Sequence, residues 1–167
     1  MIADPARVAG TQLSFQAAVE FIWREADLLD RHDYEQWLRL WTPAGLYIIP
    51  IGRDVTDHAN ALNLAYDDGA MRDARVKRLR SGLSMSATSA ARTVRTVSRF
   101  VPLVERPGAI DVRCALHIVE QKREHTRILA ADVTYRIVAG DDGLALDLKV
   151  IQLIDSDEAQ RGIAYLL

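Results

Sequence analysis

Cysteine is nearly missing from this sequence, which has one, Cys114, among its 167 residues. A single cysteine cannot form an intrachain disulfide bond. It also cannot hold an iron–sulfur cluster alone, because even a cluster with mixed ligands needs two cysteines and two histidines. Cys114 lies in an alternating apolar run, so we expect it to be a small, buried and unreactive side chain.

Long apolar runs and an excess of charge are absent too. No apolar stretch approaches the roughly 18 residues that span a bilayer, and the first residues, MIADP, lack the basic-then-apolar order of a signal peptide. We therefore expect a cytoplasmic protein without membrane contact. The 21 Lys and Arg residues face 23 Asp and Glu residues, a net charge of −2, and this balance predicts no nucleic-acid partner.

Glycine and proline are scarce, with nine and five residues respectively, so the composition excludes a linker-rich or disordered chain. At this length we expect one domain over residues 1–167. Its parts, in chain order, are an N-terminal arm (1–13), a mainly helical part with one short strand (14–82), a set of antiparallel strands (88–155) and an apolar-ended tail (156–167).

Two helices are predicted at the start of the helical part. From Ser14 to Leu29, apolar residues recur at helical spacing. Asp33 is a good N-cap for a second helix, and Gln36 three residues later completes a capping box. The apolar stripe of this second helix would consist of Tyr34, Trp37, Leu38 and Trp41.

Residues 42–45, Thr-Pro-Ala-Gly, should end the second helix before a short strand at residues 46–50. A third helix is expected over residues 68–80. Its basic side chains form either a solvated face or a docking surface for an acidic partner. They are Arg72, Arg75, Lys77, Arg78 and Arg80.

From Thr93 onward the apolar period changes to the alternation of strands. Four strands are expected, at 93–104, 110–121, 126–138 and 144–154. These elements predict an α+β fold in which helices pack on one face of a strongly curved, mainly antiparallel sheet, a cone with an inner pocket. The apolar face would hold Ile110, Val112, Cys114, Leu116 and Ile118, and in the last strand Leu144, Leu146, Leu148 and Val150, with Asp147 and Lys149 on the opposite face.

The strong motifs for metals and nucleotides are missing, since there is no His-x-x-x-His pair and no glycine-rich phosphate loop. His117 and His125 flank a predicted hairpin, and Asp132 lies on the returning strand. Together they could mimic an iron site with two histidines and one carboxylate. The same spacing is typical of polar residues on an exposed sheet face, and that alternative stays open.

An inner pocket would also suit proton transfer by a carboxylate or histidine whose pKa is shifted by burial. The sequence offers carboxylates on the first helix, a histidine and an aspartate on the sheet, and tyrosine hydroxyls as hydrogen-bond donors. Each also has a structural role open to it, as a helix-end charge, a solvated strand residue or a core tyrosine. The candidates are Asp27, Asp30, His117, Asp132, Tyr34 and Tyr47.

Residues 20–50, EFIWREADLLDRHDYEQWLRLWTPAGLYIIP, resemble the N-terminal part of the β subunit of aromatic-ring-hydroxylating dioxygenases. An acidic helix end, a Tyr-x-x-Trp stripe and a Trp-Thr stop occur together there. Residues 65–82 are similar to the family's acidic-then-basic helix, and residues 91–101 to its Arg-Thr-rich strand entry. The resemblance extends from about residue 14 to residue 155.

The resemblance implies a cystatin-like cone, related in shape to nuclear transport factor two, ketosteroid isomerase and scytalone dehydratase. It implies a catalytic α subunit as partner, with three α chains and three β chains in the assembly. The α subunit would carry a Rieske [2Fe-2S] cluster and a mononuclear iron. This chain would hold no cofactor or metal and no catalytic residue, so it would be the structural small subunit of an oxidoreductase.

The alternative function is a free-standing isomerase, dehydratase or cyclase of the same fold, acting by general acid and base catalysis in the cone. The proton transfer would then fall to Asp30, His117, Asp132 and Tyr34.

The tail is relevant to assembly, because its apolar residues are unfavourable when they are exposed to water. We expect Ile163, Tyr165, Leu166 and Leu167 to dock either within the chain or on a neighbouring subunit.

Overall fold

The computed structural model describes residues 13–81, 91–158 and 162–167. Across these residues, no helix is both long and apolar enough to cross a membrane. In chain order the elements are α1 (Phe15–Asp30), α2 (Tyr34–Leu38), β1 (Trp41–Pro50), the short 3-10 helix η1 (His58–Asn60), β2 (Asn63–Asp67), α3 (Gly69–Arg80), β3 (Arg92–Arg106), β4 (Ala109–Lys122), β5 (His125–Gly140) and β6 (Gly143–Leu153).

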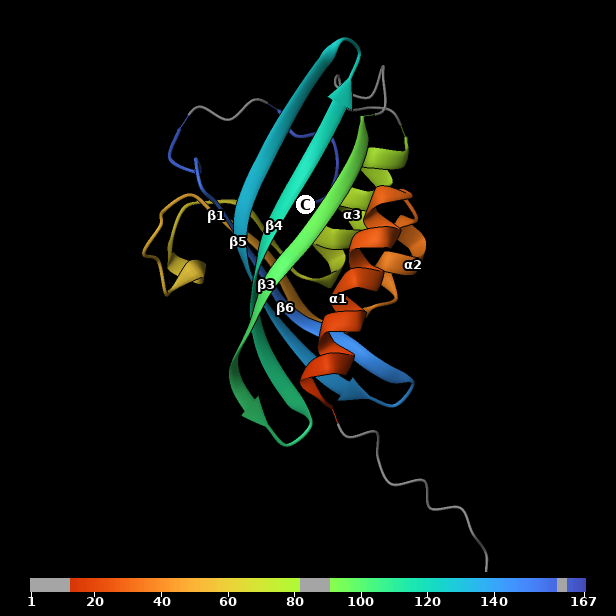
Figure 1. Ribbon diagram of the computed structural model, residues 1–167, viewed down its shortest axis with the longest axis vertical. Coiled ribbons are helices and arrows are strands. Elements are labelled where there is room, and N and C mark those ends of the chain that lie inside the picture. Colours follow the sequence, from red (N-terminus) through yellow and green to blue (C-terminus); the bar gives the residue numbers. More distant parts are fainter. Residues whose placement is uncertain (1–12, 82–90, 159–161) are drawn as a thin grey trace, which may run out of the picture.

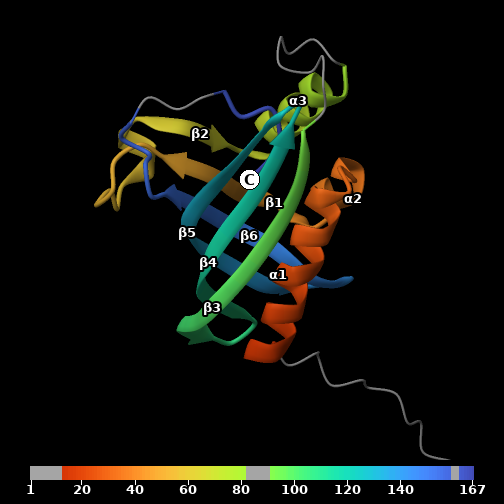
Figure 2. The same ribbon diagram turned by 45° about the horizontal axis from the view of Figure 1, so that its top comes forward.

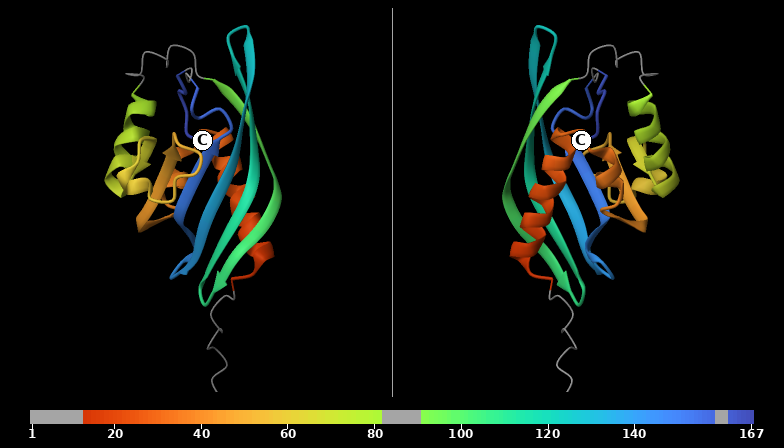
Figure 3. Two further views of the ribbon diagram at one scale, coloured as in Figure 1. Left: turned by 90° about the vertical axis from the view of Figure 1, so that its left-hand side faces the viewer. Right: turned by 90° about the vertical axis from the view of Figure 1, so that its right-hand side faces the viewer.

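The strands form one six-stranded sheet in the order β2-β1-β6-β5-β4-β3. All neighbours are antiparallel except β1 and β6, which are parallel. The long strands curve, with α1 along the concave side and α3 beside β1 and β2 (Figures 1 and 2). Views from the two sides show no described helix over the opposite face of β3–β6 (Figure 3). This arrangement confirms the predicted α+β fold with a curved, mainly antiparallel sheet.

The three described α-helices each begin after a capping residue, and Asp33 is the one that the sequence predicts as an N-cap. The side chains of Ser14, Asp33 and Asp68 each accept a hydrogen bond from the backbone N–H three residues later, at 3.1, 3.3 and 2.9 Å. Each bond satisfies a donor that has no partner within its helix. Local capping chemistry therefore sets where the helices start.

The second helix is shorter than its apolar spacing predicts. It ends at Leu38, and Trp41 is the first residue of β1. The prediction that Trp41 belongs to a helix, and that residues 42–45 precede the strand, is wrong. The reason is pairing with β6, because the N–H of Leu146 donates to the carbonyl of Leu40 at 2.7 Å and draws this segment into the sheet.

Strand β2 has no counterpart among the predicted elements, so the part of the chain expected to hold one strand holds two. Its sequence, Asn-Leu-Ala-Tyr-Asp, has no β-branched residue. The strand forms because it pairs with β1, where Asp67 lies opposite Tyr47. Asp67 is buried and forms an ion pair with Arg75 of α3. Tertiary contacts rather than local propensity fix this strand.

The inward face of β4 matches the predicted set, from Ile110 through Cys114 to Ile118, with every member at most 2% exposed. Burial raises the pKa of the Cys114 thiol to about 12. A thiol with so high a pKa is a poor nucleophile, since the thiolate is the reactive form.

The predicted face of β6 is wrong beyond Asp147. Leu146 pairs with Ile137 and Leu148 with Arg136, so Asp147 is an extra residue without an opposite partner. Such a bulge reverses the alternation of side chains that follow it. Lys149 therefore points into the cone, where it is 1% exposed.

Candidate functional site

The centre of the cone holds a buried ion pair between Glu25 of α1 and Lys149 of β6. The ammonium Nζ lies 2.7 Å from Glu25 Oε1, and each side chain is 1% exposed. Glu25 also accepts hydrogen bonds from Trp37 Nε1 at 2.9 Å and from the Tyr135 hydroxyl at 3.1 Å. A buried charge is costly unless it is paired and hydrogen-bonded, and both conditions are met here.

Residues Tyr165–Leu167, here called the tail plug, pack against this ion pair. Lys149 Nζ donates a second hydrogen bond to the Leu167 carbonyl at 2.8 Å. The Leu167 N–H donates to the Tyr47 hydroxyl at 3.0 Å. All three plug residues are buried, so the tail docks within its own chain, the first of the two expected alternatives.

Arg95 of β3 joins the tail plug to α1. Its guanidinium donates to the Leu166 carbonyl and lies over the Tyr165 ring, 5.8 Å from the centroid. The same guanidinium donates to Asp30, which also accepts from the Thr93 hydroxyl at 2.9 Å. Asp30, a proton-transfer candidate under the alternative function only, thus lies in a network of ion-pair and hydrogen-bond contacts between α1, β3 and the tail.

The tyrosines in and near the cone are held in their protonated form. Burial raises the pKa of Tyr47 and of Tyr135 above the usual value, and it raises the pKa of Tyr34 against the opposing effect of Arg95. Burial also lowers the pKa of Lys149, while the adjacent Glu25 carboxylate acts in the opposite direction. Tyr47, Tyr135 and Lys149 each form a hydrogen bond with another part of the fold, at Glu25 or at Leu167.

The interior next to the tail plug is closed. The space between Leu167 and the apolar side chains of β4, β5 and β6 is too narrow for a water molecule. A cone that performs proton transfer needs room for its substrate beside the acid or base. In the part of the interior lined by these described residues, the chain itself leaves no room for a substrate.

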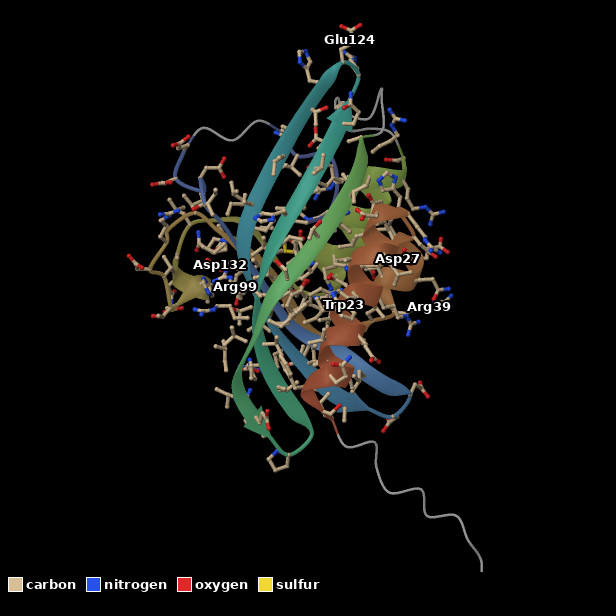
Figure 4. All side chains as sticks on the ribbon, in the orientation of Figure 1. Trp23, Asp27, Arg39, Arg99, Glu124 and Asp132 are labelled. Atoms are coloured by element: carbon tan, nitrogen blue, oxygen red, sulfur yellow. The ribbon has the colours of Figure 1, made fainter. Side chains whose placement is uncertain are left out.

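Two residues that the alternative, acid–base function would use lie elsewhere. His117 of β4 and Asp132 of β5 are exposed on the outer, convex face, and Asp132 forms an ion pair with Arg99. Figure 4 shows Asp132 beside Arg99 on one side of the sheet and Asp27 with Trp23 on α1 on the other. The structure does not bring Asp30 together with His117 or Asp132, because they lie on opposite faces.

The possible iron ligands also lie apart. His125 pairs with Lys122 at the end of the β4–β5 hairpin, whereas His117 pairs with Ala130 further along the strands. Within the described residues, no group of three or more His, Cys, Asp or Glu side chains could hold a metal ion.

The described surface carries a groove and a row of exposed apolar side chains. A groove of about 340 Å³ between α1 and β3 is lined by Trp23, Asp27 and Val97 among others. Asp27 forms an ion pair with Arg31, one helical turn later, at 3.1 Å. On the outer face, Val94, Val119 and Ile128 lie directly opposite one another on three adjacent strands. We call these three residues the apolar ladder; they are 65%, 41% and 68% exposed.

Sequence reasoning missed the central pair. Glu25 falls in the buried stripe of α1, between Ile22 and Leu29, and a charge in an apolar stripe is a signal that it has a partner. Lys149 carried no such signal, because the bulge at Asp147 reverses its expected direction.

Comparison with known proteins assigns the chain. Residues 24–157 match the family described as ring hydroxylating beta subunit. The small subunit of 2-halobenzoate 1,2-dioxygenase from Burkholderia cepacia is 28% identical over 144 residues, which cover 83% of this chain and 87% of that protein.

Solved structures agree on the fold. The β subunit of benzoate 1,2-dioxygenase from Burkholderia mallei superimposes with a TM-score of 0.77 at 17% identity, covering 93% of this chain and 99% of that one. An NTF2-like protein with a cystatin-like fold from Novosphingobium aromaticivorans gives 0.59 at 16% identity, covering 84% and 81% of the two chains. With the family match spanning most of its length, the chain belongs to the β subunits of ring-hydroxylating dioxygenases.

Proposed function

We propose that this chain, as a single domain, is the structural and non-catalytic β subunit of a cytoplasmic Rieske-type oxygenase that hydroxylates an aromatic ring. The observation that carries the proposal is the packing inside the cone: Lys149 bonds to Glu25 and Leu167 in the buried interior, and the apolar space beside Leu167 is too narrow for a water molecule. The chemistry then falls to an α subunit, and three chains of each kind form the assembly.

The iron centres belong with the α partner in this proposal. A Rieske [2Fe-2S] cluster needs two cysteines and two histidines, and this sequence has one cysteine, which is buried in the core. The described residues hold no cluster of donors for a mononuclear iron either. The side chains of this chain therefore do not fit either centre, and we assign both to the α subunit.

The outer face supports the expectation of a partner. Contiguous apolar patches of more than a few hundred Å² are uncommon on proteins that act alone and mark interaction sites. The apolar ladder is part of such a surface. Ile154, which is 56% exposed, extends it, because its N–H bonds to the Ala130 carbonyl of β5, the strand that also holds Ile128. We propose that this face becomes buried between subunits of the assembly.

The test is to co-express the affinity-tagged chain with its α partner and to record mass and visible spectrum of the purified product together. The proposal predicts a brown complex that contains equal numbers of this chain and a larger iron-containing chain. A colourless assembly of this chain alone, obtained while the α partner is present in the same cells, would refute the proposal and favour a free-standing acid–base enzyme.

A further inference from the structure

The tail plug is held in the way that proteins hold small ligands. Its residues belong to no helix or strand, so no ladder of backbone hydrogen bonds fixes them. Side chains from several strands recognise them instead. Lys149 and Tyr47 contact Leu167, Arg95 contacts Leu166, and the Tyr165 hydroxyl donates to Glu120 at 2.6 Å.

The contacts around Leu167 combine one polar anchor with apolar walls. Its carbonyl accepts from a buried ammonium, its N–H donates to a buried phenol oxygen, and its surroundings are otherwise aliphatic. A few convergent polar groups in an apolar cavity are typical of small-molecule sites. The aliphatic walls come from Leu116, Ile118, Leu129, Ile151 and Leu153.

If the tail plug left the cone, Lys149 and Tyr47 would each lose a hydrogen-bond partner. Lys149 would keep Glu25 but lose its second acceptor, and Tyr47 would lose the Leu167 N–H. Buried polar groups without partners are unfavourable, and so is an empty apolar cavity. A molecule that supplies an acceptor oxygen and an apolar body of leucine size would satisfy both.

We propose that the cone is a binding pocket whose built-in and displaceable ligand is the tail plug, and that it takes a small carbonyl compound with a branched or aromatic apolar body when the plug leaves. The Leu167 carbonyl marks the position of the ligand oxygen and the Leu167 side chain marks the position of its body. This inference goes beyond the proposed function, which needs only that the cone is filled.

The first test compares the full chain with a variant that lacks residues 165–167. The probe is N-acetyl-leucinamide, followed by calorimetry and by the shift in Tm, with N-acetyl-leucine as a charged companion. We expect at least tenfold tighter binding of one of these probes to the shortened chain than to the full chain. In the shortened chain, the further double substitution Glu25→Gln and Lys149→Met should weaken that binding at least tenfold.

Two results would overturn the proposal. In the first, the shortened chain folds but binds neither probe. In the second, the shortened chain with the double substitution binds a probe as tightly as the shortened chain without it. If the shortened chain does not fold, hydrogen exchange of the full chain tests whether the tail plug leaves a cone that stays folded. We expect the Leu167 amide to exchange through a local opening while the amides of Val133 and Ile151 stay protected. Exchange of all three amides only together would show that the plug does not leave a folded cone. Neither experiment involves the α subunit, so each is independent of the proposed function.

Discussion

Glu25 and Lys149 meet in the centre of the cone at 2.7 Å, although 124 residues separate them along the chain. One comes from the middle of α1 and the other from β6, just after the bulge at Asp147. The pair therefore joins the helical layer to the sheet. Lys149 extends the link to the tail through Leu167.

Breaking this pair from one side should destabilise the protein strongly. Lys149→Met leaves the Glu25 carboxylate buried without its cation, and Glu25→Gln leaves the ammonium without its anion. Each should lower the free energy of unfolding by about 3–5 kcal/mol. The double variant should cost less than either single one, because neither charge is then stranded. Urea denaturation of the four proteins measures this, and additive losses would contradict the coupling.

Leu167 should contribute to stability as a core residue although it lies in an irregular tail. Leu167→Ala removes a fully buried side chain and should cost about 2–5 kcal/mol. The matched control is Ile154→Ala, whose side chain is 56% exposed and whose loss should cost about 0.5 kcal/mol or less. Thermal and denaturant unfolding compare the two, and equal small losses would show that the tail is not anchored.

The buried thiol should make stability fall at high pH. The pKa of Cys114 rises from 9.0 to about 12 in the folded chain. Between these values the unfolded chain releases the proton while the folded chain keeps it, so stability decreases as pH rises. The loss from this group is at most about 4 kcal/mol. In the Cys114→Ala variant, the free energy of unfolding measured by urea denaturation should fall less steeply between pH 9 and 12 than in the unaltered chain. An identical slope in both proteins would show that the Cys114 thiol does not cause the loss.

The apolar ladder should matter for assembly and not for folding. Val119→Lys or Ile128→Lys places a charge at the middle or the end of the ladder, where it costs little while the face is exposed to water. Desolvating that charge in an interface is expensive. We expect normal unfolding of the isolated chain and at least tenfold weaker association with the other subunits, measured by analytical ultracentrifugation. Ala74→Lys on exposed α3 is the control, and unimpaired assembly of both ladder variants would place the interface elsewhere.

Local chemistry made much of the fold predictable. Ser14, Asp33 and Asp68 cap helices because short polar side chains satisfy free N–H groups wherever the fold is assembled. The alternation around Cys114 fixed the buried face of β4 in the same local way. What could not be predicted depends on partners distant in sequence: the pairing that draws Trp41 into a strand, the formation of β2 against β1, and the bulge that turns Lys149 inward.

The candidate site followed the same division. Tyr34 is buried, as the apolar stripe of the second helix predicts, and Asp30 ends the first helix close to its predicted end. His117 and Asp132 lie outside the cone, as the alternation of β4 and β5 requires. The central pair escaped prediction because one register shift decides the direction of Lys149.

The most direct test of a non-catalytic role is turnover by the assembled oxygenase that contains altered copies of this chain. The informative substitutions are Tyr34→Phe, His117→Ala and Asp132→Asn, each made singly and each checked for unchanged mass of the complex. The account predicts the same kcat as the unaltered complex for all three variants. A loss of kcat of tenfold or more in any fully assembled variant would contradict it and would place a catalytic group in this chain.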